Sequence, residues 1–119
     1  MPERALGLTQ PISQIKAELF RALAHPARVR ALEILTEGER SVGELQPLVG
    51  IELSHLSQQL GVLRRAGLVT TRKVGSSVIY TIRDRELVEL LATAKRLLIN
   101  SLRETNELLA GLGADPVTP

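Results

Sequence analysis

The residues with the clearest chemical potential in this chain lie between positions 53 and 83. This stretch holds five Lys or Arg and no Asp or Glu, whereas the residues before it and after it carry more acids than bases. Basic side chains neutralise nucleic-acid phosphates, and that contribution dominates the affinity of proteins for DNA. Charge alone leaves two interpretations equally open: a segment that faces a polyanion, or a chance excess of five charges.

The spacing of these residues adds a second signal. On a helix over residues 53–66, with Leu56, Leu60 and Leu63 facing the core, the outer face carries hydroxyl, amide, imidazole and guanidinium groups but no carboxylate. Ser and Gln hydrogen-bond to base edges, and Arg binds guanine or phosphate. An ordinary solvated face usually contains Glu and Lys pairs. We therefore expect the major groove of DNA to be met by Ser54, His55, Ser57, Gln58 and Arg65, and phosphates to be held by Arg64, Arg72 and Lys73.

The elements that must position this face follow from periodicity and from Gly and Pro punctuation. The pattern predicts four helices, then a hairpin that turns at Gly75-Ser76, then one long helix. Three short helices followed by a two-stranded wing make a winged helix-turn-helix, in a mainly α fold with a small β-hairpin. The predicted helices start at Pro11, Pro26, Ser41 and Leu53 and end near Leu23, Gly38, Gly50 and Ala66; the strands are Leu68–Val74 and Ser77–Ile82, and the last helix runs from Asp84 to Gly111.

The first and last predicted helices carry apolar stripes that a small domain cannot fully cover. The last one, at about 25 residues, is roughly 38 Å long. Exposed stripes of this kind mark association surfaces, so we expect a homodimer formed through these two helices. We further expect a flexible arm over residues 1–10, one domain over 11–112 and a tail over 113–119. Pro47, inside the third helix, is expected to shorten or distort its last turn.

Composition excludes several classes of protein. The 119 residues contain no Cys, which excludes disulfides and thiolate metal sites. Phe20 and Tyr80 are the only Phe, Tyr or Trp residues, too few for a single-strand binder of the stacking type. No apolar run approaches the ~20 residues of a membrane span, and the N-terminus lacks a secretion signal, so we expect a cytoplasmic protein without a membrane partner.

Three segments resemble the ArsR/SmtB family of small bacterial winged-helix transcriptional regulators. They are Leu23–Leu32, Ser41–Leu45 and Leu53–Val69, and the resemblance covers about residues 12–100. It implies a homodimer, built on the first and last helices, that binds double-stranded DNA at an imperfect inverted repeat. Most members repress transcription and leave the DNA when an inducer binds, so the resemblance also implies an inducer or a partner protein that supplies the signal.

The chain departs from the family pattern at several places. Gln59 stands where the family commonly has His, and Gly61 where Lys is frequent. The cysteine pair of many metal-binding members is absent, and the last helix has no His, so we expect no metal and no cofactor. His25, at a recurrent family position before a helix, is expected to be structural. For His55, DNA contact and an idle surface position stay equally open.

Two other classes of function compete with DNA binding. An enzyme would need a nucleophile with its base, paired carboxylates or a phosphate-binding loop, and none of these patterns is present, so we expect no catalysis. The alternative is a winged-helix protein-interaction module, or a regulator that is controlled by a partner protein. The acid-free stretch 53–83 argues against the interaction module.

Overall fold

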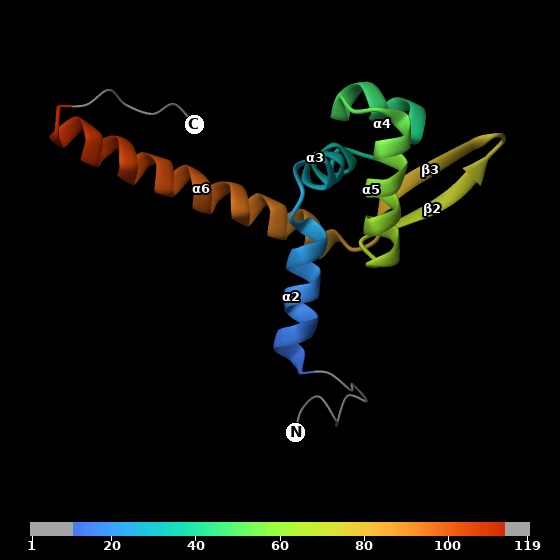
Figure 1. The fold of residues 1–119 in the computed structure, drawn as a ribbon, viewed down its shortest axis with the longest axis horizontal. Helices are drawn as coiled ribbons and strands as arrows, with labels where there is room; N and C mark the ends of the chain where they lie inside the picture. Colours follow the sequence, from blue (N-terminus) through green and yellow to red (C-terminus); the bar gives the residue numbers. More distant parts are fainter. Residues whose placement is uncertain (1–10, 114–119) are drawn as a thin grey trace. The chain divides into compact units, whose positions relative to one another are not determined.

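The computed structural model describes residues 11–113, in two compact units that meet at Asp84 and Arg85 (Figure 1). The expected arm over residues 1–10 and nearly all of the expected tail over 113–119 lie outside the described residues. The predicted order of elements is confirmed, with one strand added. The elements are α2 (Ile12–Leu23), α3 (Pro26–Leu35), β1 (Arg40–Ser41), α4 (Val42–Val49), α5 (Leu53–Arg65), β2 (Val69–Val74), β3 (Ser77–Ile82) and α6 (Arg85–Gly111).

Two helices begin at side chains that cap them. His25 precedes α3, and its Nδ1 accepts a hydrogen bond from the backbone N–H of Ala27 at 3.0 Å. Ser41 precedes α4 and forms a capping box with Glu44. Ser41 Oγ accepts from the Glu44 N–H at 3.1 Å, and Glu44 Oε1 accepts from the Ser41 N–H at 2.9 Å. The backbone hydrogen bond from Ser41 holds the pKa of the Glu44 carboxyl below its ordinary value.

Of the two expected effects of Pro47, a shortened or a distorted last turn, the shortening is wrong, because α4 continues through Pro47 to Val49. Proline lacks an N–H, so one hydrogen bond within the helix is lost. The capping box holds the first turn, and Gly50 holds the last. Gly50 adopts a left-handed φ of 80°, and its N–H donates to the carbonyl oxygen of Gln46 at 2.8 Å. Both ends of this short helix are therefore fixed independently of Pro47.

The core of the first unit is leucine-rich. Helices α3, α4 and α5 contribute its fully buried side chains, and β2 and β3 add one buried residue each. The three buried leucines of α5 recur at intervals of four and three residues, so its opposite face points outward. The largest fully buried side chains are Leu32, Leu45, Leu56, Leu60 and Leu63, and the two buried residues from β2 and β3 are Val69 and Ile82.

The hairpin of β2 and β3 is confirmed, with Gly75 at the turn in a left-handed conformation (φ 61°). The structure corrects one point of the predicted fold, because the sheet has three strands in the order β1-β3-β2. In β1, Arg40 and Ser41 pair antiparallel with Tyr80 and Ile79. A strand of two residues has no alternation for a sequence pattern to detect.

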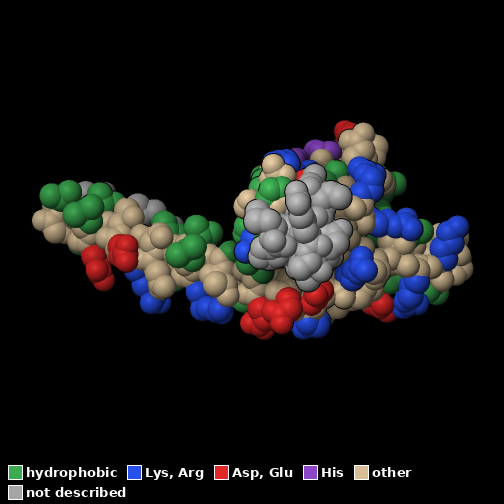
Figure 2. All heavy atoms as spheres, turned by 90° about the horizontal axis from the view of Figure 1, so that it is seen from below, with side chains coloured by type: hydrophobic (Ala, Val, Ile, Leu, Met, Phe, Trp, Pro, Cys, Tyr) green, Lys and Arg blue, Asp and Glu red, His purple; other side chains and the backbone are tan. Residues whose placement is uncertain are grey.

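The second unit contains one long helix, α6, with strongly segregated side chains. Figure 2 shows hydrophobic side chains along one side of α6 and charged side chains along the other. Four leucines between the middle of α6 and the residue just after it are largely exposed: Leu97 (66%), Leu98 (62%), Leu108 (65%) and Leu112 (74%). Within residues 11–113, the structure contains no helix with the length and apolar character needed to cross a membrane.

Candidate nucleic-acid interface

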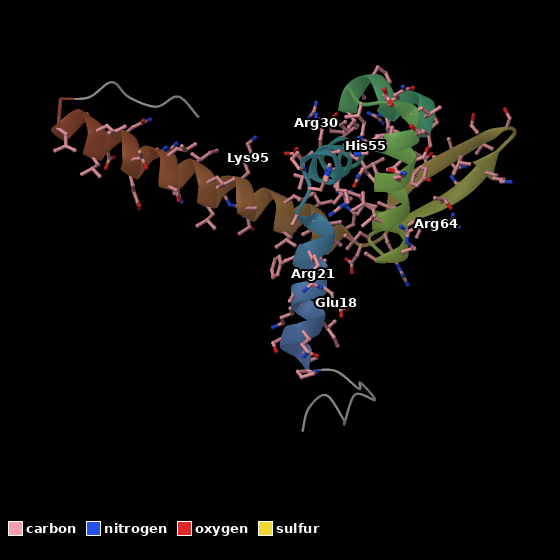
Figure 3. All side chains as sticks on the ribbon, viewed as in Figure 1. Glu18, Arg21, Arg30, His55, Arg64 and Lys95 are labelled. Carbon is pink, nitrogen blue, oxygen red and sulfur yellow. The ribbon has the colours of Figure 1, made fainter. Side chains whose placement is uncertain are left out.

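Helix α5 presents the predicted polar face to the outside. All six predicted residues of this helix are exposed, while Leu56, Leu60 and Leu63 are fully buried behind them. Figure 3 shows Arg64 at the C-terminal end of α5, directed away from the helix. The exposed residues are Ser54, His55, Ser57, Gln58, Arg64 and Arg65.

The guanidinium of Arg65 lies over Gly61, one turn earlier on α5. A methyl group added at Gly61 would stand 3.0 Å from Arg65 Nη1. The glycine therefore leaves room for the arginine to lie along the outer face of the helix. Sequence reasoning placed both residues on this face but did not predict that the one makes space for the other.

The hairpin contributes two exposed basic residues, Arg72 and Lys73. Arg72 forms an ion pair with Glu39, and the distance from Nη2 to Oε1 is 2.5 Å. The other carboxylate oxygen of Glu39 accepts a hydrogen bond from Thr81 Oγ1 at 3.4 Å. Figure 2 shows Lys and Arg side chains gathered around the end of the molecule that carries the hairpin. The sequence pattern gave no sign that Arg72 has an acidic neighbour.

An open groove of about 410 Å³ lies between the start of α5 and the turn end of the hairpin. Its lining includes Leu53 and Ser57, four residues apart at the start of α5, and Ser76 and Ser77 at the hairpin turn. Residues of α4 close its remaining side, and the described lining residues include no Asp, Glu, Lys or Arg. The groove therefore offers hydroxyl and apolar contacts between two basic elements.

The two histidines of the chain meet in the fold. The rings of His25 and His55 are arranged edge to face, with their centroids 5.8 Å apart. His25 has the structural role expected of it, since its Nδ1 caps α3. The contact with His55, at the start of α5, was missed because the two residues are 30 positions apart. Among the described residues, no group of three or more His, Cys, Asp or Glu is placed to hold a metal ion.

Known proteins with the same features are bacterial regulators. The profile of the family "Bacterial regulatory protein, arsR family" matches residues 25–71. The chain is 50% identical, over 107 residues, to an HTH-type transcriptional regulator of Mycobacterium tuberculosis, Rv0081; these residues are 89% of this chain and 94% of that protein. The crystal structure of Rv0081 superposes with a TM-score of 0.75 at 52% identity, and the match covers 82% of this chain and 98% of the other.

Two further relatives extend the comparison. A biofilm growth-associated repressor of Xylella fastidiosa is 43% identical over 75 residues, which are 63% of this chain and 66% of that protein. The NMR structure of a homodimeric winged helix-turn-helix DNA-binding domain of Mycobacterium bovis, Mb0332, superposes with a TM-score of 0.73 at 26% identity, covering 87% of this chain and 92% of the other. These relatives are transcriptional regulators and not enzymes. The chain belongs to the ArsR family and is a transcriptional regulator with a winged-helix DNA-binding domain.

Proposed function

We propose that this regulator is a homodimeric repressor that binds an inverted-repeat operator in double-stranded DNA. Helix α5, the recognition helix, enters the major groove, and the β2–β3 hairpin lies along the phosphates beside it. The protein acts in the cytoplasm, without a metal or cofactor, and an inducer or partner protein releases it. Ser54, His55, Ser57, Gln58 and Arg65 contact bases, and Arg64, Arg72 and Lys73 contact phosphates.

The observation that carries this proposal is the outer face of the recognition helix. Three fully buried leucines anchor the helix to the core, and Ser54, Gln58 and Arg65 on the opposite face are exposed. Residues 53–83 contain no carboxylate that would repel phosphates. Hydroxyl, amide and guanidinium groups on such a face match the donor and acceptor pattern of base edges. This arrangement suits a helix that reads sequence.

The exposed leucines on α6 and directly after it support the proposed dimer. At about 100° per residue, Leu97, Leu98, Leu108 and Leu112 fall within one sector of roughly 100°. An apolar stripe of that width is typical of a helix face that packs against another element. Phe20 on α2 is also largely exposed, at 56%. The relative Mb0332 is a homodimer, which supports the same assembly for this chain.

Footprinting tests the proposal directly. The full-length protein is incubated with DNA from upstream of its own gene, and DNase I cleavage is mapped on both strands. A dimer predicts two protected half-sites whose centres lie about one helical turn apart, or a multiple of it. A Leu98→Lys variant, charged within the apolar stripe, should sediment as a monomer and lose the paired footprint. A single protected half-site, or no footprint with the wild type, would contradict the proposal.

The sign of regulation needs a separate assay. A reporter gene is placed behind the footprinted DNA, and its expression is measured with and without the regulator. Repression predicts lower expression of the reporter when the regulator is present. The Gln58→Ala variant should repress less, so that much of the reporter expression returns. Higher expression in the presence of the regulator would identify an activator and would overturn the repressor assignment.

A further inference from the structure

The guanidinium of Arg28 connects three helices of the first unit, α2, α3 and α5, which pack against one another (Figure 1). Arg28 lies in the first turn of α3 and is half-buried. Its Nε donates to the carbonyl oxygen of Ala22 at 2.7 Å, and its Nη2 donates to that of Arg21 at 3.2 Å. Its Nη1 donates to Oε1 of Gln59, on the recognition helix, at 2.7 Å.

The acceptors explain why an arginine stands at this position. The carbonyl groups of Arg21 and Ala22 lie in the last turn of α2, where backbone oxygens have no partner within the helix. The Arg21 oxygen also accepts from the backbone N–H of Ala24, just after the helix, at 3.1 Å. A cation is favoured there by the helix dipole as well. The planar guanidinium donates in several directions at once, whereas a lysine ammonium does not hold such a fixed geometry. All three nitrogens of Arg28 therefore donate within the protein, unlike the exposed guanidinium groups of the recognition helix.

Gln59 occupies the border between the two faces of the recognition helix. It is half-buried, between exposed Gln58 and fully buried Leu60. Because α5 is a rigid helix, a rotation about its axis that moved Gln59 would move Gln58 through the same angle. Together with the three buried leucines of this helix, the hydrogen bond from Arg28 therefore restrains the direction in which Gln58 points.

We propose that Arg28 is a positioning residue that sets the rotation of the recognition helix relative to α2, and thereby the half-site spacing that the dimer accepts. The inference rests on the proposed function, in which α2 belongs to the dimer surface and α5 enters the groove. In a dimer, a fixed geometry between these two helices keeps the two recognition helices at one separation and one angle. DNA whose half-sites are displaced or rotated then fits poorly.

The experiment compares two duplexes with the full-length protein. One carries the footprinted operator, and the other carries the same operator with one base pair inserted between its half-sites, which rotates them by roughly 35°. Dissociation constants for both are measured by fluorescence anisotropy at several salt concentrations. Gln59→Leu removes the side-chain oxygen that accepts the hydrogen bond from Arg28, and the leucine side chain is of similar size. Gln59→Glu keeps an acceptor for Arg28 and is the matched control.

The wild type and Gln59→Glu should prefer the native spacing to the same degree. Gln59→Leu should lose about tenfold of that preference, since a hydrogen bond from a charged donor is removed. Its salt dependence should equal that of the wild type, because no phosphate contact is lost. Arg28→Lys keeps the positive charge but cannot donate to Ala22, Arg21 and Gln59 in the same fixed geometry, so it should behave like Gln59→Leu. If one of these two variants does not fold, the other still provides the test.

Two results would overturn the inference. The first is a folded Gln59→Leu protein, checked by circular dichroism, that keeps the full preference for the native spacing. The second is a salt slope lower by about 0.9 in Gln59→Leu, which would mean that a phosphate contact is lost instead. A wild type that binds no duplex selectively would contradict the proposed function, whereas a selective wild type with unaffected variants would contradict this inference alone.

Discussion

Arg72 on β2 and Glu39, the residue before β1, form an ion pair with 2.5 Å between Nη2 and Oε1. The pair joins the hairpin to the short strand on the other edge of the sheet. Glu39 also accepts a hydrogen bond from Thr81, which orients its carboxylate. A DNA phosphate that approaches Arg72 must therefore compete with an acidic group already in place.

Removal of that acidic group should tighten DNA binding. In Glu39→Gln, Arg72 is released to phosphates and one repulsive charge disappears, so the affinity for every duplex should rise and the salt dependence should steepen. The free energy of unfolding should change by less than about 1 kcal/mol, because ion pairs this exposed contribute little. Glu37→Gln removes an equal charge from the same segment between α3 and β1 and leaves the pair intact. Equal effects of the two variants on DNA affinity would show that the pair does not restrain Arg72.

Two variants on the recognition helix should distinguish the loss of a base contact from the loss of a phosphate contact. Gln58→Ala should reduce discrimination between the operator and a scrambled duplex, since an amide paired with adenine contributes about 1–3 kcal/mol to specificity. Arg64→Ala should weaken both duplexes alike and lower the salt slope by about 0.9. Anisotropy titrations of both variants against both duplexes measure these effects. Unchanged discrimination in Gln58→Ala would remove this residue from base readout.

Gly61→Ala should stabilise the protein and weaken its DNA binding. Alanine in a helix interior is favoured over glycine by up to about 1 kcal/mol, which should raise the melting temperature by several degrees. The added methyl would stand 3.0 Å from Arg65 Nη1, the mobile end of that side chain, and would displace it from the outer face. Gly111→Ala, where the methyl meets nothing within 4 Å, is the control and should leave DNA binding unchanged. An unaltered operator affinity in Gly61→Ala would argue against a DNA contact by Arg65.

The capping box of α4 should make stability depend on pH. Hydrogen bonding from Ser41 lowers the pKa of Glu44 in the folded protein from its ordinary 4.5. The ionised carboxylate therefore stabilises the fold above pH 4.5, and this contribution disappears as the pH falls through the lower folded pKa. Glu44→Gln keeps an acceptor for the Ser41 N–H but removes the charge. The difference in urea-unfolding free energy between wild type and variant should shrink below pH 4.5, and a difference that is constant with pH would contradict this assignment.

Local signals made much of the fold predictable from sequence. The starts of α3 and α4 follow from Pro26 and from the Ser41–Glu44 spacing, and the glycines Gly67 and Gly75 mark the end of α5 and the hairpin turn. The inner face of the recognition helix follows from leucines at helical intervals. These features depend on neighbours along the chain, which a sequence pattern records directly.

The contacts that refine the candidate site could not be predicted in this way. Arg28 and Gln59 are 31 positions apart, and Arg72 and Glu39 are 33 apart, so each pair meets only after the helices and the sheet have packed. Neither partner stands in a recognisable motif with the other. The same holds for β1, whose two residues become a strand only because β3 offers an edge beside them. Tertiary packing, and not local propensity, decides these features.

The central claim, that the recognition helix reads DNA sequence, is tested most directly by an anisotropy titration of the wild-type protein. The protein is titrated against a duplex from upstream of its own gene and against a scrambled duplex, at several salt concentrations and without added metal. A helix that reads sequence should give tight binding to the first duplex, much weaker binding to the second, and a steep fall in affinity with salt. Equal binding to both duplexes, or binding that is insensitive to salt, would contradict it and would favour a winged helix that serves protein contacts.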